Sequence, residues 1–284
     1  EKKMFGKIIG TGSYVPKEIV TNKDLAQYLD TDDTWIRERT GVKSRHISGD
    51  KETTADMAVK AAEKALENSG LLPDEIDLII VSSVSSNLVL PSTACFVQKA
   101  INAKNAFCFD INVACTGFIT AYNISQTFIN TGLINTALII GAESLSKITD
   151  WSDRKTCILF GDGAGAVVIK KDENAMFETV MFSNGKNGDA LTMENPFALR
   201  KTNLGKNHQG QFDISFQDIQ KTYINMDGGE IFKFAVKKVP ECIEALLEKI
   251  HMDKDEIDKY LLHQANSRII EGIAKRSKIP LKKI

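Results

Sequence analysis

Two stretches of this chain resemble each other, and that repetition restricts the folds open to it. The first, LENSGLLPDEIDLIIVS, begins at Leu66, and the second, LEKIHMDKDEIDKYLLH, begins at Leu247. They align without a gap and share the run Asp-Glu-Ile-Asp, which duplication explains better than chance. Each copy reads as a helix end, a loop and a strand. We therefore expect two similar α/β halves about a pseudo-twofold axis, residues 1–172 and residues 173–284.

The order of elements in the first half also favours an α/β fold. A helix is predicted after Thr53, where a Thr-x-x-Asp spacing resembles a capping box, and Gly70 ends it. Ile76–Val84 is an almost continuous apolar run, typical of a strand covered on both faces. Ser92 can cap a further helix, and Ala137–Gly141 is another apolar run. Helices that alternate with apolar strands predict a mainly parallel sheet.

The second half contains fewer clear patterns. Glu178–Ser183 and the stretch that ends at His263 are predicted strands, and Lys186–Gly210 is a polar stretch that we expect to be a mobile insertion. Gly228–Ile250 has a helical pattern that Pro240 interrupts, so we expect a kink or two abutting helices there.

Charge and cysteine content exclude several classes of protein. The 284 residues carry a net charge of −1, so no overall field attracts the chain to nucleic acid or to a membrane surface. No apolar run approaches the roughly 20 residues that span a bilayer. The five cysteines are scattered, which is typical of a chain kept in a reducing cytoplasm. The four histidines show no metal-ligand spacing, and we expect no metal site.

The segment Phe107–Thr120, FCFDINVACTGFIT, places a cysteine between two elements. An apolar run ends at Ile111, small residues surround Cys115, and apolar residues at helical spacing start at Phe118. The pattern predicts a strand, a tight elbow and a helix with Cys115 in its first turn. The helix N-terminus would favour thiolate over thiol, which makes Cys115 a candidate nucleophile. The alternative is a small buried apolar residue, the usual role of a free cysteine.

His263 lies at the end of the repeated strand in the second half. Ligands usually bind at the carboxyl ends of strands in parallel α/β sheets. The polar neighbours Gln264, Asn266 and Arg268 favour a site, whereas the alternative is a histidine that is simply hydrogen-bonded within a loop. A pseudo-twofold axis could bring His263 close to Cys115 as a base or a hydrogen-bond donor.

Two further stretches are unusual. Thr31–His46 is rich in arginine around Trp35, and one helical turn would place Trp35 and Arg39 on the same face. Such a pair can hold the base and phosphates of a nucleotide, or it can belong to a solvated charged surface. FGDGAGAVVI, from Phe160, is glycine-rich but lacks the Lys-Ser/Thr of a phosphate loop. We expect a tight backbone crossing into a strand there.

Together these stretches resemble the β-ketoacyl-acyl-carrier-protein synthase III family of the thiolase fold. The resemblance extends from IIGTGSYVP to LLHQANSRII. Its most specific segments are TDDTWIRERTGVKSRH, DINVACTGF, FGDGAGA, MDGGEIFKFAV and LLHQAN. It implies an α/β, thiolase-like chain whose two duplicated halves form a five-layer αβαβα arrangement, and which pairs as a homodimer.

The resemblance also implies roles for single residues. Cys115 matches the acylated cysteine, and His263 matches the catalytic histidine. The third catalytic residue, an asparagine in a Gly-Asn-Thr-Ser run, is expected beyond Ile284 together with a glycine-rich loop, so we expect the chain to lack its C-terminal end. Leu90 matches a position where some members carry a phenylalanine that reaches the acyl pocket of the partner subunit, and the smaller side chain would admit a longer or branched acyl group. The remaining matches are coenzyme A contacts at Trp35, Arg39, Arg154, Gly228, Phe232 and Asn266, and carrier-protein contacts at Lys233, Gln264, Ala265, Asn266, Ser267, Arg268, Lys275 and Arg276.

The implied function is that of a condensing acyltransferase that initiates type II fatty-acid synthesis in the cytoplasm. A short acyl-CoA would acylate Cys115. Decarboxylative Claisen condensation with malonyl-acyl-carrier protein would then give β-ketoacyl-acyl-carrier protein, CoA and CO₂. Both thioesters are substrates, and no cofactor, nucleic acid or membrane partner is expected. The alternatives are a related condensing enzyme of secondary metabolism or biotin-precursor synthesis, a non-catalytic partner subunit, which usually lacks the reactive cysteine, and a cysteine hydrolase.

Overall fold

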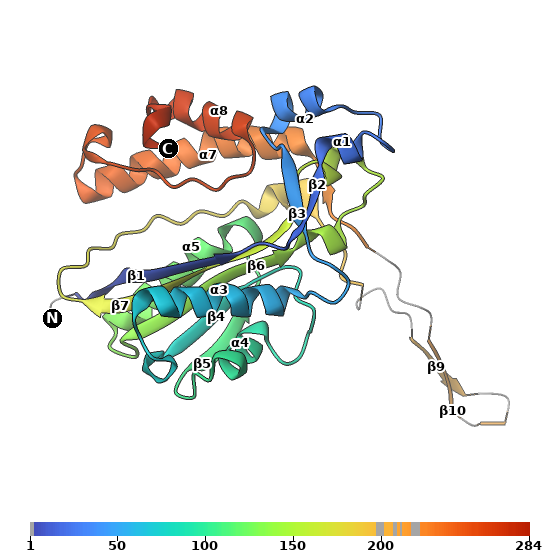
Figure 1. The fold of residues 1–284 in the computed structure, drawn as a ribbon, viewed down its shortest axis with the longest axis horizontal. Helices are drawn as coiled ribbons and strands as arrows, with labels where there is room; N and C mark the ends of the chain where they lie inside the picture. The colour runs from blue at the N-terminus through green and yellow to red at the C-terminus, as the bar shows by residue number, and fades with distance from the viewer. Residues whose placement is uncertain (1–2, 197–201, 207–208, 211, 217–221) are drawn as a thin grey trace.

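A mixed five-stranded sheet forms the centre of the first half (Figure 1). The structure, a computed structural model, describes residues 3–196, 202–206, 209–210, 212–216 and 222–284. The strands of the sheet are β1 (Phe5–Tyr14), β4 (Leu78–Ser82), β5 (Phe107–Ile111), β6 (Thr136–Ser144) and β7 (Asp162–Asp172). Their order is β1-β7-β6-β4-β5, with β4 parallel to β5 and β6, and β7 antiparallel to β6 and β1. The predicted parallel pairing therefore holds for three strands, because the chain turns back after β6 to form β7.

Helices cover both faces of this sheet (Figure 1). They are α3 (Thr54–Ser69) and α4 (Thr93–Ile101) on one face and α5 (Gly117–Asn130) on the other. In β4, Ile79 and Val81 pack with α3 and α4, whereas Leu78 and Ile80 pack with α5, and all four are fully buried. Successive side chains of a strand point to opposite faces, so a strand between two helical layers is apolar throughout.

The ends of these helices form where the sequence predicts them. Thr53 and Asp56 form the capping box of α3, and Gly70 follows the helix with a φ of 70°. Ser92 accepts a hydrogen bond from the Cys95 N–H at the start of α4. Side-chain caps and a left-handed glycine satisfy backbone groups that a helix cannot pair internally, so these boundaries follow from local chemistry.

The two copies of the repeat share their local structure. Gly70 after α3 and His251 after α7 (Gly228–Ile250) both adopt the left-handed conformation, with φ of 70° and 54°. A single 3-10 turn follows each helix. Within it, the side chains of Glu75 and Glu256 each accept a hydrogen bond from the N–H three residues earlier, at 2.9 and 2.6 Å. The same geometry at equivalent positions supports the duplication inferred from the sequence.

Helices α7 and α8 (Ser267–Ser277) pack together on the α5 side of the sheet (Figure 1). Helix α7 continues through Pro240, so the expected division into two helices does not occur. Proline removes one intrahelical hydrogen bond. Close packing on α8 offsets that loss, and Gly272 permits it, because a Cβ there would lie 2.6 Å from Cγ1 of Val236.

Two predicted strands of the second half are extended but unpaired. Glu178–Ser183 and residues 257–263 run alongside α7 and α8 (Figure 1), and neither pairs with a strand among the described residues. Lys249 of α7 anchors the first segment, since its Nζ lies 2.6 Å from the Glu178 carboxylate and donates to the Thr179 carbonyl at 3.2 Å. A strand exists through hydrogen bonds to a neighbour, so the apolar pattern alone did not produce one here.

The remaining elements are short. They are β2 (Glu18–Thr21), β3 (Ser44–Ile47), β8 (Leu191–Thr192), β9 (Thr202–Lys206), β10 (Phe212–Phe216), β11 (Asn225–Met226), α1 (Asn22–Leu25), α2 (Asp33–Thr40) and α6 (Arg154–Cys157). The strands pair antiparallel as β2 with β3, β9 with β10 and β8 with β11. The stretch Lys186–Gly210, expected to be a mobile insertion, contains β8 and β9, and its residues 197–201 and 207–208 lie outside the described part of the chain.

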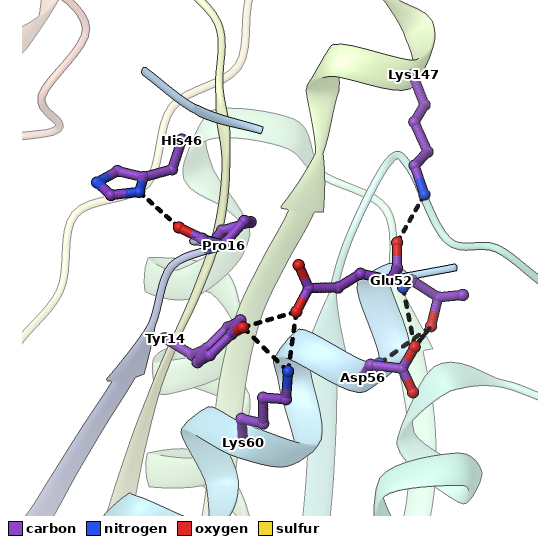
Figure 2. A network of polar contacts seen from close by, with 8 residues as sticks. Tyr14, Pro16, His46, Glu52, Asp56, Lys60 and Lys147 are labelled. Carbon is purple, nitrogen blue, oxygen red and sulfur yellow. Dashed lines mark hydrogen bonds and ion pairs between the residues drawn. The ribbon is translucent and has the colours of Figure 1, made fainter. Parts of the chain in front are cut away.

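A polar network ties the end of β1 to α3 (Figure 2). Tyr14 Oη donates to Glu52 Oε1 at 2.7 Å, and Lys60 Nζ donates to both groups, at 3.0 and 2.8 Å. The Lys60 ammonium also lies 4.1 Å from the centroid of the Tyr14 ring. Lys147 donates to the Glu52 carbonyl at 2.7 Å. These groups satisfy one another, so we assign the network a structural role.

Gln126 of α5 is fully buried and binds the backbone of β1. Its Oε1 accepts from the Gly6 N–H at 2.7 Å, and its Nε2 donates to the Gly6 carbonyl at 2.9 Å. Gly6 has no room for a side chain, because a Cβ would lie 2.4 Å from Cγ2 of Ile169. The amide therefore completes the hydrogen bonding of an edge strand from within the core.

Replacement of Gln126 by alanine should destabilise the fold. Two backbone groups of Gly6 would lose their partners inside the protein, at about 1–3 kcal/mol each. We expect urea denaturation of the Gln126→Ala variant to show a free energy of unfolding lower by about 2–4 kcal/mol. The exposed Gln27→Ala variant is the control and should stay within about 0.5 kcal/mol of the parent. Equal losses in both variants would contradict the role given to Gln126.

Candidate active site

Cys115 lies on a sharp turn between β5 and α5, as predicted. Strand β5 ends at Ile111, a 3-10 turn spans Ala114–Thr116, and α5 begins at Gly117. Ala114 has a φ of 46°, a left-handed conformation that residues with a side chain rarely adopt. Cys115 is exposed, which excludes the alternative of a buried core thiol. The elbow therefore presents the thiol at the surface of the first half.

The electrostatic surroundings of Cys115 differ from the expectation. Although the residue is exposed, protein atoms beside the thiol displace part of its water, and this desolvation raises the pKa of Cys115. A hydrogen bond from its own N–H lowers that pKa, as expected at a helix start, and the negative charge of Glu143 raises it. Desolvation outweighs that hydrogen bond, so the net shift of the Cys115 pKa is upward, opposite to the predicted preference for thiolate.

Close contact with β4 sets the position of the elbow. A Cβ on Gly117 would lie 1.7 Å from Oγ of Ser82, the last residue of β4. Only glycine allows the first residue of α5 to approach the strand so closely. The next residue, Ser83, donates its N–H to the Ile111 carbonyl at 3.2 Å and joins the ends of β4 and β5. The chain before the elbow and the chain after it are therefore both tied to β4.

Two acidic residues, in the DINVACTGF and FGDGAGA motifs, hold loops at the end of the sheet where the Cys115 elbow lies. The Asp110 carboxylate in β5 accepts from the N–H groups of Thr93 and Ala94, at 2.6 and 2.8 Å, and so caps α4 from a neighbouring strand. Asp162, in the glycine-rich motif, is buried and accepts four hydrogen bonds from the N–H and hydroxyl groups of Ser48 and Ser146. That motif is therefore a structural crossing, as expected.

His263 lies in the exposed loop before α8. Desolvation lowers the pKa of His263 below the usual value for imidazole, so the ring is neutral at pH 7. In the alignment of the two repeats, His263 occupies the position of Ser82, the residue against which the Cys115 elbow packs. The duplication thus places it at the corresponding end of the second half. Its role with Cys115 stays a prediction.

Trp35, Arg39 and Arg154 form one cluster, although they come from α2 and α6. The Cζ atoms of Arg39 and Arg154 lie 4.2 and 4.7 Å from the centroid of the Trp35 ring. Asp32 caps α2 through the Trp35 N–H at 2.7 Å. The Asp30 carbonyl accepts from the Arg154 guanidinium, and the Asp30 carboxylate lies 3.6 Å from it. An aromatic ring beside two guanidinium groups suits stacking on a base and pairing with phosphates.

Helix α8 packs against α2 and so adjoins this cluster. Arg268 Nε donates to the Glu38 carbonyl at 3.2 Å, and a Cβ on Gly41 would lie 3.1 Å from Cβ of Ser267. The Asn266 side chain caps α8, which begins at Ser267. The stretch Gln264–Arg268 expected to meet a carrier protein therefore lies beside the cluster expected to bind coenzyme A.

The other residues singled out in the second half lie on α7 and α8. Gly228 is the first residue of α7, and Phe232 follows one turn later on the side that faces α8. Lys233 forms an exposed ion pair within α7. Lys275 and Arg276 are exposed in the last turn of α8. These basic side chains are accessible to an acidic partner.

Leu90 lies on an apolar loop that follows β4. The exposed fractions of Leu88, Val89 and Leu90 are 43%, 70% and 84%. Three neighbouring apolar side chains on one loop are an unusual surface for a single chain and favour contact with another protein surface.

Comparison with known proteins identifies the family. The profile described as 3-oxoacyl-[acyl-carrier-protein (ACP)] synthase III matches residues 109–185, which include Cys115. A β-ketoacyl-[acyl-carrier-protein] synthase III of Clostridium acetobutylicum is 47% identical over 276 residues, which cover 95% of this chain and 80% of the relative. This chain belongs to the β-ketoacyl-acyl-carrier-protein synthase III family.

Solved structures agree with this assignment and give the synthase III chain its thiolase fold. The structure of 3-oxoacyl-[acyl-carrier-protein] synthase III from Aquifex aeolicus VF5 aligns with a TM-score of 0.78 at 41% identity, covering 98% of this chain and 82% of that one. The priming β-ketosynthase of the R1128 polyketide biosynthetic pathway aligns with a TM-score of 0.85 at 28% identity, covering 100% and 81%.

The sequence did not predict the roles of three residues in the segments around the elbow of this synthase III chain. Ser82, Asp110 and Glu143 lie in strands, and none of them is part of a sequence pattern typical of a nucleophile or a ligand site. The only sequence feature that distinguishes them is that each is a polar residue at or near the end of an apolar run. Their partners are backbone N–H groups and hydroxyls from other elements, which the sequence does not place.

The described residues contain no group of three or more histidine, cysteine, aspartate or glutamate side chains that could hold a metal ion. No helix in the same part of the chain is long and apolar enough to cross a membrane.

Substitution of Gly117 by alanine should displace the elbow. The new Cβ would overlap Ser82, and overpacking of this kind costs about 1–3 kcal/mol of the free energy of unfolding. Replacing Ser82 by glycine in the same chain removes the overlapping atoms and should recover more than half of the loss. Gly165→Ala in β7 is the matched control, because its Cβ would meet nothing within 4 Å. Thermal and urea unfolding measure all variants, and a double variant no more stable than Gly117→Ala would contradict the contact.

Proposed function

We propose that this chain catalyses the decarboxylative condensation that starts fatty-acid chains in type II synthesis. A short acyl-CoA acylates Cys115, and malonyl-acyl-carrier protein accepts the acyl group. The observation that carries the proposal is an exposed cysteine on a strained elbow in a chain of the synthase III family. The names of the relatives state the same activity, β-ketoacyl-acyl-carrier-protein synthesis.

The first step is transfer of the acyl group to the thiol. The Cys115 sulfur attacks the thioester carbonyl, and the backbone N–H of Cys115 donates to the oxygen that becomes negative. The bond to coenzyme A sulfur then breaks, and the proton of the thiol leaves with coenzyme A. Desolvation raises the pKa of the free thiol, so the thiolate that attacks the carbonyl forms only when the substrate is bound.

The second step is condensation with the malonyl thioester. Loss of CO₂ leaves an enolate, whose carbon attacks the carbonyl of acyl-Cys115 and displaces the cysteine sulfur. His263 donates a hydrogen bond through Nε2 to the enolate oxygen, and the lowered pKa of His263 suits a neutral donor. The reaction uses the two thioester substrates and no bound cofactor.

The two substrates bind along one path in this proposal. Trp35 and Arg154 stack on the adenine of coenzyme A, and Arg39 pairs with its phosphates. Gly228, Phe232 and Asn266 follow the pantetheine arm. The acidic carrier protein docks on Lys233, Gln264–Arg268, Lys275 and Arg276, with an association rate that falls as salt is raised. The adjacency of α8 and α2 supports a shared entrance.

We also propose that the enzyme is a cytoplasmic homodimer. Strand β5 is an edge of the five-stranded sheet. Phe107 in β5 is 42% exposed, and Phe96 in the adjoining α4 is 38% exposed. An apolar edge strand of this kind is a template for pairing with a second copy, and the exposed Leu88–Leu90 loop would extend the contact. Sedimentation of the complete gene product would contradict this if it gave the mass of one chain.

A second candidate is a priming condensing enzyme of specialised metabolism. The TM-score of 0.85 to a polyketide priming ketosynthase supports it. The chemistry at Cys115 would be the same, and the acyl acceptor and primer would differ. Product analysis with malonyl thioesters of different carrier proteins separates the two. Retention of Cys115 and His263 speaks against a non-catalytic partner subunit.

Removal of the two proposed catalytic side chains should separate the half-reactions. Cys115→Ala should abolish acylation by acyl-CoA, whereas His263→Ala should be acylated normally but lose about 10²–10³-fold in malonyl decarboxylation. Intact-mass spectrometry follows acylation, and CO₂ release follows decarboxylation, both on the complete gene product. Cys242→Ala is the control and should gain the acyl group. Acylation of the Cys115→Ala variant would place the nucleophile elsewhere.

The primer range should depend on Leu90. Leu90→Phe should narrow the acyl pocket and shift the preference from longer or branched acyl-CoA toward acetyl-CoA by about tenfold. Competition between acyl-CoA substrates gives the ratio of kcat/KM values. If the parent used only acetyl-CoA and Leu90→Phe changed nothing, Leu90 would have no role in the choice of primer.

A further inference from the structure

Glu143, near the end of β6, is a half-buried carboxylate held by hydrogen-bond donors. The Val84 N–H donates to Oε1 and Oε2 at 3.0 and 3.2 Å. The hydroxyls of Ser83, at 3.3 Å, and Ser85 donate to Oε2. No ion pair to Glu143 occurs among the described residues. The carboxyl group is therefore held by one short segment, Ser83–Ser85. Burial raises the pKa of Glu143, and the hydrogen bonds from this segment oppose that rise.

Two other elements hold the same segment. Thr54, the first residue of α3, donates through its hydroxyl to the Ser85 carbonyl at 2.7 Å, and its Oγ1 also lies 2.8 Å from Ser144 Oγ. The Ser144 N–H donates to Ser85 Oγ at 2.7 Å. The Ala55 N–H donates to Oδ1 of Asn87 at 3.3 Å. The base of this loop is thus fixed by α3 and β6, whereas its tip, which includes Leu90, is exposed.

The segment borders the Cys115 elbow. Ser82 abuts Gly117, and the Ser83 N–H is bonded to the Ile111 carbonyl. Direct contacts therefore connect Glu143 to Ser83–Ser85, and Ser82 and Ser83 to the elbow, at one end of the sheet.

The other carboxylates at this end of the sheet have hydrogen-bond donors of their own. Asp110 in β5 and Asp162 in β7 each have their own backbone donors. His263, proposed to face Cys115 from the second half, is neutral at pH 7. Among these carboxylates, Glu143 is the one whose charge acts on Cys115.

We propose that Glu143 is a positioning residue of the acylation site, which fixes Ser83–Ser85 against the elbow and thereby sets the orientation and reactivity of Cys115. This inference rests on the proposed function of Cys115. Its carboxylate repels the thiolate, so the free enzyme keeps a thiol that reacts slowly with small electrophiles. Acylation then depends on a bound substrate rather than on a permanently ionised sulfur.

The Glu143→Gln variant tests the charge with little change of shape. The glutamine oxygen can accept from the Val84 N–H, and the serine hydroxyls can rotate to accept from its amide. Loss of the negative charge lowers the pKa of Cys115. We expect the pH midpoint of Cys115 alkylation by iodoacetamide to fall by about 0.5–1 unit, with alkylation about three- to tenfold faster at pH 7. Peptide mass spectrometry follows Cys115 separately from the other four thiols.

Ser85→Ala tests the positioning role separately. It keeps the charge but removes a donor that holds the segment. We expect no downward shift of the alkylation midpoint and a loss of about tenfold in the rate of acyl transfer from acyl-CoA. If Glu143→Gln does not fold, Ser85→Ala still decides the matter, because an unchanged acyl-transfer rate in that variant overturns the proposal.

Glu52→Gln is the matched control. Glu52 also accepts hydrogen bonds from a hydroxyl and a lysine in a surface network (Figure 2), but it belongs to the β1–α3 contact. An unchanged midpoint in Glu143→Gln, or an equal shift in Glu52→Gln, overturns the inference. Alkylation needs neither acyl-CoA nor carrier protein, so this failure leaves the proposed function intact. Acylation of the Cys115→Ala variant would instead overturn the proposed function.

Discussion

The close approach of α5 to the end of β4 is the contact on which the site depends. With glycine at 117, the helix begins directly against Ser82, and the chain between β5 and α5 must turn within a few residues. That turn forces Ala114 into a left-handed conformation and exposes Cys115. A nucleophile at the end of a sheet needs such an elbow, because a thiol on a regular strand or helix face would be covered by the next layer.

Three carboxylates at the end of the sheet that carries this elbow bind the backbone of the neighbouring loops. Asp110, Glu143 and Asp162 each accept hydrogen bonds from backbone N–H groups of a different segment. Loops that lack repetitive structure have unpaired N–H groups, and a carboxylate can satisfy several at once. The glycine-rich and Asp-Ile-Asn motifs are therefore largely structural. Glu143 differs from the other two because its charge also acts on Cys115.

The second half shows how much a strand depends on its neighbours. The helix end and 3-10 turn of the first repeat recur in the second with the same left-handed residue and the same glutamate contact. The stretch that follows is strand β4 in the first copy and an unpaired extended segment, residues 257–263, in the second. The helix end and the turn depend on residues within each copy of the repeat. A paired strand also requires neighbouring strands from other parts of the chain.

The sequence by itself determined the helix caps at Thr53 and Ser92, the strand β4 that is buried on both faces, and the elbow at Cys115, because each depends on residues close together in the chain. It also determined the repeat and the family, because both depend on motifs in a fixed order. The tertiary structure alone decided the antiparallel return of β7, the continuity of α7 through Pro240 and the desolvation that raises the pKa of Cys115. It also brought Arg154 to Trp35 and the Ser83–Ser85 segment to Glu143. These features arise from contacts between distant segments and from the exclusion of water, and neither is encoded in local spacing.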